Sequence, residues 1–131
     1  MKIGMVAHES KKMLMQNLCI AYQAILKKNE LYATGTTGRL VEEQTNLTVH
    51  KYLPGHLGGV QQLGAQIESN DLDLLIFLRE PVAPKKTDPD ADYLFRLCDR
   101  NNIPLATNLA TAELLIRSLE AGGLEWREAY K

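Results

Sequence analysis

The sequence is poor in the features that mark secreted, membrane-spanning or nucleic-acid-binding proteins. Its 131 residues contain two cysteines, and no apolar run approaches the roughly 18 to 20 residues of a membrane-spanning helix. Lysine and arginine number 15 against 16 for aspartate and glutamate, so the formal net charge is −1. This balance gives no electrostatic reason to expect binding to nucleic acid or to an anionic membrane.

Cys19 and Cys98 each lie inside an apolar helical pattern. This placement favours two buried thiols in a reducing compartment over a disulfide or a metal-binding pair. We therefore expect a cytoplasmic protein with no metal and no other cofactor.

Apolar residues make up 45% of the chain, and no repeat or linker divides it, which predicts a single domain over residues 1–131. Short apolar runs alternate with segments of helical spacing. The runs predict strands at residues 3–7, 31–34, 47–53, 72–78 and 103–107, and the spacing predicts helices at residues 14–26, 39–43, 59–67, 89–97 and 111–119. This alternation predicts an α/β fold in which a parallel sheet lies between two layers of helices.

The most informative segment is residues 31–38, Leu-Tyr-Ala-Thr-Gly-Thr-Thr-Gly. The end of a strand leads directly into a turn with two glycines and three threonines, and residues 39–43 continue as a helix. Such a turn exposes backbone N–H groups at the positive end of the helix dipole, and the hydroxyls add further donors. The segment is suited to hold a phosphate group. Its alternative interpretation is a threonine-rich turn with an N-cap and no ligand.

Polar residues also follow the other predicted strands, where parallel sheets bind their ligands. Together these positions are His8, residues 34–38, 54–59 and 80–87, and Asn108. Lys12 lies four residues after His8, about one helical turn further on. A neutral imidazole can polarise a carbonyl and an ammonium can balance phosphate charge, so the pattern predicts a site for a small phosphorylated ligand.

Several of these segments resemble those of one known family. The Tyr-Ala-Thr-Gly-Thr-Thr-Gly of residues 32–38 and the Gly-Gly-Val-Gln-Gln-Leu-Gly-Ala of residues 58–65 are the most specific. The other segments that carry the resemblance are residues 5–8 with Lys12, 55–57, 73–81, 88–90 and 103–108. On these residues the chain resembles the methylglyoxal synthase family nearly end to end.

The resemblance implies a three-layer α/β/α fold with a five-stranded parallel sheet and flavodoxin-like winding. It also implies a homo-hexamer, with residues 124–131 and the loop after Glu80 near subunit contacts. The implied reaction eliminates phosphate from dihydroxyacetone phosphate to give methylglyoxal. His8 matches the histidine that contacts the carbonyl and hydroxyl oxygens of the substrate. The positions that match the family's phosphate ligands are Lys12, Thr34, Gly35, Thr36, Thr37 and Gly55.

The sequence departs from the family at the groups that move protons. The family motif Ser-Gly-Pro-x-Gly-Gly-Asp-Gln-Gln corresponds to residues 54–62, which read Pro-Gly-His-Leu-Gly-Gly-Val-Gln-Gln. Val60 stands in place of the aspartate base, Pro54 in place of a serine phosphate ligand, and His56 in place of a proline. In the later loop, Thr87 stands in place of a second substrate-contacting histidine.

Two hypotheses follow from these departures. In the first, the chain is a methylglyoxal synthase that is feebly active or uses a relocated base, for which the candidates are His56, Glu80 and Asp90. In the second, it is a catalytically silent phosphate-metabolite sensor or regulatory subunit. The regulatory domain of carbamoyl-phosphate synthetase, which has a similar fold and binds effectors without catalysis, is a precedent for the second.

Overall fold

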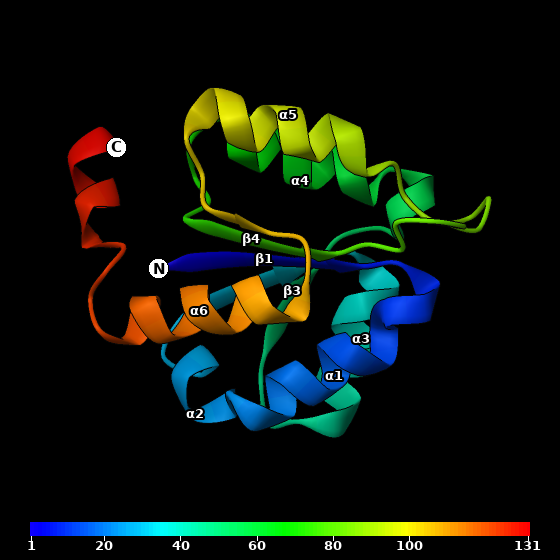
Figure 1. Cartoon of the computed structure of the whole chain (residues 1–131), viewed down its shortest axis with the longest axis horizontal. Helices are drawn as coiled ribbons and strands as arrows, with labels where there is room; N and C mark the ends of the chain where they lie inside the picture. Colours follow the sequence, from blue (N-terminus) through cyan, green and yellow to red (C-terminus); the bar gives the residue numbers. More distant parts are fainter.

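The computed structural model describes residues 1–131 and contains one five-stranded sheet with every pairing parallel (Figure 1). The strand order is β3-β2-β1-β4-β5. The strands are β1 (Lys2–Ala7), β2 (Glu30–Ala33), β3 (Val49–Lys51), β4 (Leu74–Leu78) and β5 (Leu105–Ala106). The predicted five-stranded parallel sheet is confirmed.

Helices cover both faces of the sheet, as predicted. Figure 1 shows α4 and α5 on one face, and α1, α3 and α6 on the other, which agrees with the packing of α4 on α5 and of α1 on α3 and α6. The helices are η1 (Glu9–Lys11), α1 (Lys12–Ala21), α2 (Gln23–Leu26), α3 (Gly35–Gln44), η2 (Gly55–Leu57), α4 (Gly59–Glu68), α5 (Ala91–Asn101), α6 (Leu109–Glu120) and η3 (Glu125–Tyr130).

The central strands β1 and β4 separate two apolar clusters. Side chains alternate between the faces of a strand, so Met5 packs with α1 and α6 residues, whereas Val6 packs with α4 and α5 residues. All five residues of β4 are buried. This double burial explains why the strands read as continuous apolar runs in the sequence.

The strand order reverses between β1 and β4. The sheet is doubly wound as in flavodoxin-like folds, although its order is 3-2-1-4-5 and flavodoxin's is 2-1-3-4-5. Connections that follow β1 and β4 leave toward opposite faces of the sheet, and they open a crevice at the carboxyl edge. The fold therefore places the residues after the strands along one edge.

Several element boundaries differ from the predicted ones. The predicted helix at residues 14–26 is divided into α1 and α2 at Tyr22, and the strand predicted at residues 47–53 is limited to Val49–Lys51. Pro89 lies before the N-cap Asp90 and not in the first turn of α5. Cys19 and Cys98 are buried free thiols, as predicted, and burial raises the pKa of each to about 12. None of the helices is both long and apolar enough to span a bilayer.

Candidate functional site

A cavity of about 90 Å³ lies beyond the carboxyl ends of β1 and β2. We call it the threonine cavity. Three segments meet there: the turn after β1, the first turn of α3, and the start of η2, with residues 87–89 as a cover. Its lining residues are Ala7, Glu9, Lys12, Thr34, Thr36, Gly55, His56, Thr87, Asp88 and Pro89.

The threonine segment forms the first turn of α3. Thr34 is the N-cap in an extended conformation, and α3 begins at Gly35, four residues before the predicted helix. Gly35 donates its N–H to Leu53 O at 3.1 Å, and a Cβ there would lie 2.8 Å from the backbone oxygen of Tyr52. Glycine is required because the β3 connection passes so close. The local preference of glycine and threonine against helix is outweighed by this packing.

The hydroxyl of Thr37 has no hydrogen-bond partner. Every other buried side-chain nitrogen or oxygen atom in residues 1–131 has a hydrogen-bond partner. Thr37 is completely buried. Backbone N–H groups in a first helical turn also have no acceptor within the helix, and Thr36 and Thr37 occupy that turn. Gly35 and Thr37 do not line the cavity themselves, and Thr37 directly follows the lining residue Thr36. An unpartnered buried hydroxyl beside unpartnered N–H groups is suited to an acceptor with several oxygens.

Lys12 places a positive charge at the same cavity. Its Nζ atom donates to Ala7 O at 3.1 Å and lies 3.7 Å from Glu9 Oε2. The side chain is 20% exposed, so its charge is only partly solvated. The ammonium and the α3 N-terminus thus favour an anion in the cavity.

Gly55 brings the η2 loop against the cover. A Cβ at Gly55 would lie 3.0 Å from the Cβ and Cγ atoms of Pro89, so a side chain there would push the two loops apart. The next residue, His56, also lines the cavity. Pro54 does not line it, and its carbonyl accepts the N–H groups of Leu57 and Gly59.

Glu9 and Asp88 line the cavity although the sequence reasoning did not select them. Asp88 Oδ1 accepts the N–H of Glu9 at 2.8 Å, and Oδ2 accepts the N–H of Lys85 at 2.7 Å. Burial raises the pKa of Asp88, but these two bonds and the nearby positive charge of Lys12 outweigh it and the pKa is lowered overall. Glu9 directly follows the predicted position His8 after β1, and the rule that selected His8 applies to it equally.

His8 is buried behind the cavity and does not line it. Its Nδ1 atom accepts the N–H of Glu80 at 2.9 Å. Nε2 must then carry the proton, and it donates to Pro89 O at 2.8 Å. The ring also meets Phe77 edge to face, with centroids 5.3 Å apart. Both nitrogen atoms of His8 are therefore engaged with the backbone.

Glu80 and Asp90 line a neighbouring cavity of about 290 Å³, which His8 also lines. Glu80 accepts the N–H of Val82 at 2.9 Å, and this bond is the largest cause of its lowered pKa. Asp90 caps α5 by accepting the N–H of Asp92 at 3.0 Å. Of the three candidates for a relocated base, the structure brings only His56 to the threonine cavity.

Val60 is 3% exposed and lies within the apolar cluster of α4, α5 and the sheet, with Val6 and Phe77. No group of three or more histidine, cysteine, aspartate or glutamate side chains in the chain is arranged to hold a metal ion.

Comparison with known proteins shows that the chain belongs to one protein family. Residues 15–107 match the family described as MGS-like domain. The chain is 57% identical over 128 residues to a methylglyoxal synthase of Caldicellulosiruptor saccharolyticus, covering 98% of this chain and 91% of that one. It is 54% identical over 131 residues to a methylglyoxal synthase of Thermoanaerobacterium thermosaccharolyticum, with coverage of 100% and 98%.

A solved structure shows the same likeness. The crystal structure of methylglyoxal synthase from Elizabethkingia anophelis NUHP1 superposes with a TM-score of 0.86 at 37% sequence identity. The match covers 88% of this chain and 76% of that one. The resemblance in sequence and the architecture therefore agree.

Proposed function

Because this chain belongs to the methylglyoxal synthase family, we propose that its threonine cavity binds the phosphate group of a small phosphorylated metabolite, dihydroxyacetone phosphate being the family's substrate. The observation that carries the proposal is the buried Thr37 hydroxyl, which has no partner within the protein. A buried donor left unsatisfied costs about 1–3 kcal/mol. A phosphate oxygen at the α3 N-terminus relieves that cost.

The charge and the size of the cavity support the same ligand. Lys12 balances part of the phosphate charge, and Thr34 and Thr36 supply two further hydroxyls at the lining. Hydrogen bonds to a charged group contribute roughly 1.5–3 kcal/mol each. A volume of about 90 Å³ suits a phosphate group or a compact phosphate ester more than a large ligand.

We further propose that turnover of dihydroxyacetone phosphate by this chain is slow. The family's reaction removes a proton next to the substrate carbonyl and then expels phosphate. Val60 has no atom that accepts a proton, and a positioned general base contributes about 10²–10⁴-fold in rate. His56 lines the cavity and is the candidate replacement from the sequence, and the structure adds the carboxylates of Glu9 and Asp88 to the lining.

A sensor or regulatory subunit that binds the metabolite without converting it is the second candidate function. The observation in its favour is the packing of Val60, whose side chain is buried in the apolar cluster and carries no atom that accepts a proton. Both candidates share the phosphate site, so binding is tested first and turnover separately.

Calorimetric titration with inorganic phosphate tests the site. We expect Thr37→Val and Lys12→Met to weaken binding about tenfold or more, because each removes one charge-assisted interaction. Thr48→Val and Lys27→Met, at exposed positions outside the cavity, are the matched controls. Without phosphate, Thr37→Val should also unfold at a higher temperature than the wild type, since valine removes the unsatisfied hydroxyl.

Two results would contradict the proposal. One is the absence of any heat of binding to the wild-type chain at millimolar phosphate. The other is phosphate affinity in Thr37→Val and Lys12→Met equal to that of the two controls.

A further inference from the structure

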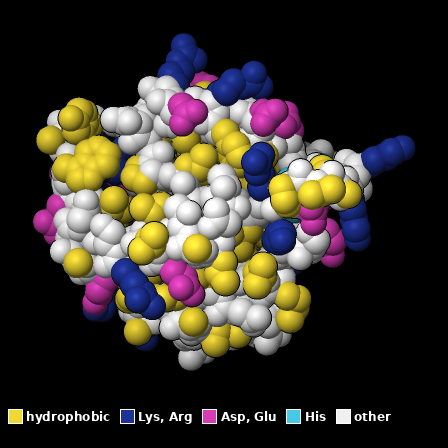
Figure 2. All heavy atoms as spheres, in the orientation of Figure 1, with side chains coloured by type: hydrophobic (Ala, Val, Ile, Leu, Met, Phe, Trp, Pro, Cys, Tyr) yellow, Lys and Arg dark blue, Asp and Glu magenta, His cyan; other side chains and the backbone are white.

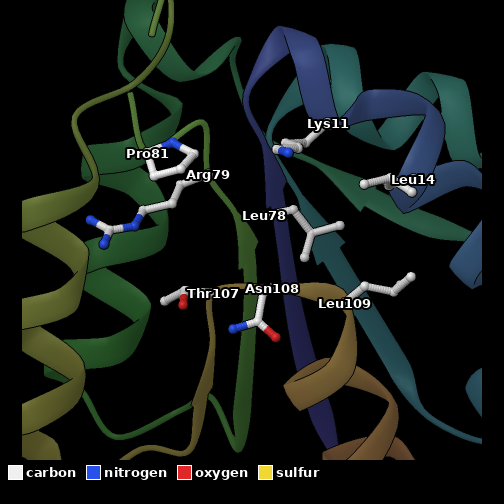
Figure 3. Close-up of a pocket in the computed structure, with 8 residues that line it drawn as sticks. All are labelled: Lys11, Leu14, Leu78, Arg79, Pro81, Thr107, Asn108 and Leu109. Carbon is white, nitrogen blue, oxygen red and sulfur yellow. The ribbon is translucent and has the colours of Figure 1, made fainter. Parts of the chain in front are cut away.

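A second and larger cavity, of about 390 Å³, is lined by residues of η1, α1, α6 and the segments after β4 and β5 (Figure 3). The two cavities share no lining residue. Consecutive residues of one turn divide between them: Lys11 lines this cavity, and Lys12 lines the threonine cavity. Its volume falls within the roughly 300–1,000 Å³ of small-molecule sites.

One side of the cavity is apolar. Figure 3 shows Leu78 at the end of β4, with Leu14 of α1 and Leu109 of α6 beside it. Leu14 is 38% exposed, and Leu109 is only partly buried. A leucine that faces a hollow loses packing contacts that a ligand with an apolar body restores.

Two positively charged residues, Lys11 and Arg79, also line the cavity. Neither Lys11 nor Arg79 takes part in an ion pair or a side-chain hydrogen bond. The Arg79 guanidinium extends toward α5, where it lies 5.4 Å from the ring centroid of Phe95. The adjacent carboxylate, Glu80, is occupied by Ser10 and by the N–H of Val82. Lys11 lies near enough to Glu80 to help lower the pKa of that carboxyl, but it makes no ion pair with it, so its ammonium is available to an anion. The Arg79 guanidinium points away from the leucines in Figure 3, and it has to turn from Phe95 to reach the same anion.

Thr107 and Asn108 add hydrogen-bonding groups beside the cations. They follow β5 directly, at the carboxyl edge where parallel sheets bind ligands. Asn108 uses Oδ1 to cap α6, accepting the N–H of Thr111 at 3.0 Å, and its amide NH₂ group makes no hydrogen bond within the protein. Asn108 was among the strand-end residues of the sequence pattern, and the threonine cavity makes no use of it.

We propose that this cavity is a binding site for a small organic anion, a carboxylate or a phosphate monoester with a compact apolar body. Lys11 binds the anionic group, Arg79 joins it by turning away from Phe95, Asn108 donates to it, and the leucines cover the apolar part. The site is separate from the proposed phosphate site, so each can be present or absent without the other.

Relaxation-optimised amide NMR spectra of the full chain test the proposal, because they report each cavity separately. Backbone amides of Thr107 and Leu109 report this cavity, and those of Thr36 and Thr37 report the threonine cavity. The probes are phenyl phosphate, benzoate and inorganic phosphate. We expect phenyl phosphate, benzoate or both to give saturable shifts at Thr107 and Leu109, and inorganic phosphate to act there at least about tenfold more weakly, because it leaves the leucines uncovered.

Charge-removing variants identify the groups that bind. The double variant Lys11→Met with Arg79→Met should weaken the Thr107 and Leu109 response about tenfold or more. The matched control, Lys27→Met with Arg100→Met, removes two exposed charges elsewhere and should bind as the wild type does. The proposal is wrong if neither organic probe saturates these shifts, if inorganic phosphate does so equally tightly, or if the two double variants bind alike.

Discussion

The Nδ1 atom of His8 accepts a hydrogen bond from the backbone N–H of Glu80 at 2.9 Å. This bond ties the end of β1 to the loop that follows β4, across the point where the strand order reverses. The same ring donates from Nε2 to Pro89, at the other end of that loop. A neutral imidazole thus holds residues 80–89 over the site. To contact a substrate oxygen, as the family resemblance implies, His8 has to release one of these bonds.

We expect His8→Phe to loosen the loop. Phenylalanine keeps an aromatic ring against Phe77 but leaves the N–H of Glu80 without its acceptor, which costs about 1–3 kcal/mol of local stability. Amide hydrogen exchange at Glu80 should therefore become faster. The matched control is His50→Phe, at an exposed histidine of β3. Unchanged exchange at Glu80 in His8→Phe would show that the loop is held by other contacts.

A second prediction concerns the charged cluster that fixes the C-terminal segment. Arg127 is 1% exposed and donates from Nε to Asp73 Oδ1 at 3.1 Å, and Lys131 Nζ lies 2.8 Å from the same oxygen. Arg127→Met leaves the buried Asp73 carboxylate without its buried partner. We expect a loss of about 3–5 kcal/mol in the free energy of unfolding, measured by denaturant titration.

The double variant Arg127→Met with Asp73→Asn is the control, since it removes both charges and should recover part of that loss.

The same cluster makes the stability of the protein depend on pH. Burial raises the pKa of Asp73, but the bonds from Lys131, Lys2 and Arg127 outweigh it and the pKa is lowered overall. Its stabilisation is therefore complete above the ordinary carboxyl pKa of about 4 and is lost as the pH falls below it. Equal stability of wild type and Arg127→Met would contradict this interpretation.

We expect Val60→Asp to raise the rate of methylglyoxal formation. Gly58, Gly59, Gln61 and Gln62 around it match the family pattern, so the new carboxylate should be presented as in the family. The same change places a charge in an apolar cluster, so the variant should be less stable than the wild type. Adding Thr87→His and Pro54→Ser should raise the rate further, because active-site groups that act as a unit give their full effect only together.

The outcome distinguishes two causes of slow turnover. If Val60→Asp and the triple variant remain silent while binding phosphate and staying folded, the missing base is not what disables the site. If the wild type is already fast, the base lies elsewhere, and His56→Ala and Glu9→Gln should then be compared.

We also expect a homo-hexamer, as the family resemblance implies. Exposed apolar side chains gather on several surfaces, as the yellow groups of Figure 2 show on one face. Val82, in the loop after Glu80, is 87% exposed, and Trp126 and Tyr130 of the tail are 43% and 68% exposed. Light scattering at micromolar concentration should give six times the 14.7 kDa chain mass, and Val82→Asp should lower it. A monomer mass for the wild type would contradict this expectation.

The sequence predicted the sheet well because β1 and β4 are buried on both faces and carry uninterrupted apolar runs. It predicted α3 less well. Gly35, Thr36, Thr37 and Gly38 favour a turn by local preference, yet they form the first helical turn because Gly35 packs against the backbone of Tyr52. That contact joins residues distant in the chain, and no local pattern contains it.

For the site, the residues that line the cavity were predicted where they follow a strand closely, as Thr34 and Thr36 do, or lie about one helical turn after a strand end, as Lys12 does. The hydrogen bonding of the His8 ring was not predicted. Its two hydrogen bonds lead to Glu80 and Pro89, more than 70 residues away, and only the folded chain reveals them. Asp88 was missed as a lining residue for the same reason, since its loop folds back over β1.

The most direct test of a retained phosphate site with impaired chemistry is the rate of methylglyoxal formation from dihydroxyacetone phosphate. The purified wild-type chain should be assayed beside the Caldicellulosiruptor saccharolyticus methylglyoxal synthase, with phosphate binding measured on the same samples. We expect this chain to bind phosphate and to turn over about 10²–10⁴-fold more slowly, the loss typical of a missing general base. A comparable rate in the two proteins would contradict that expectation.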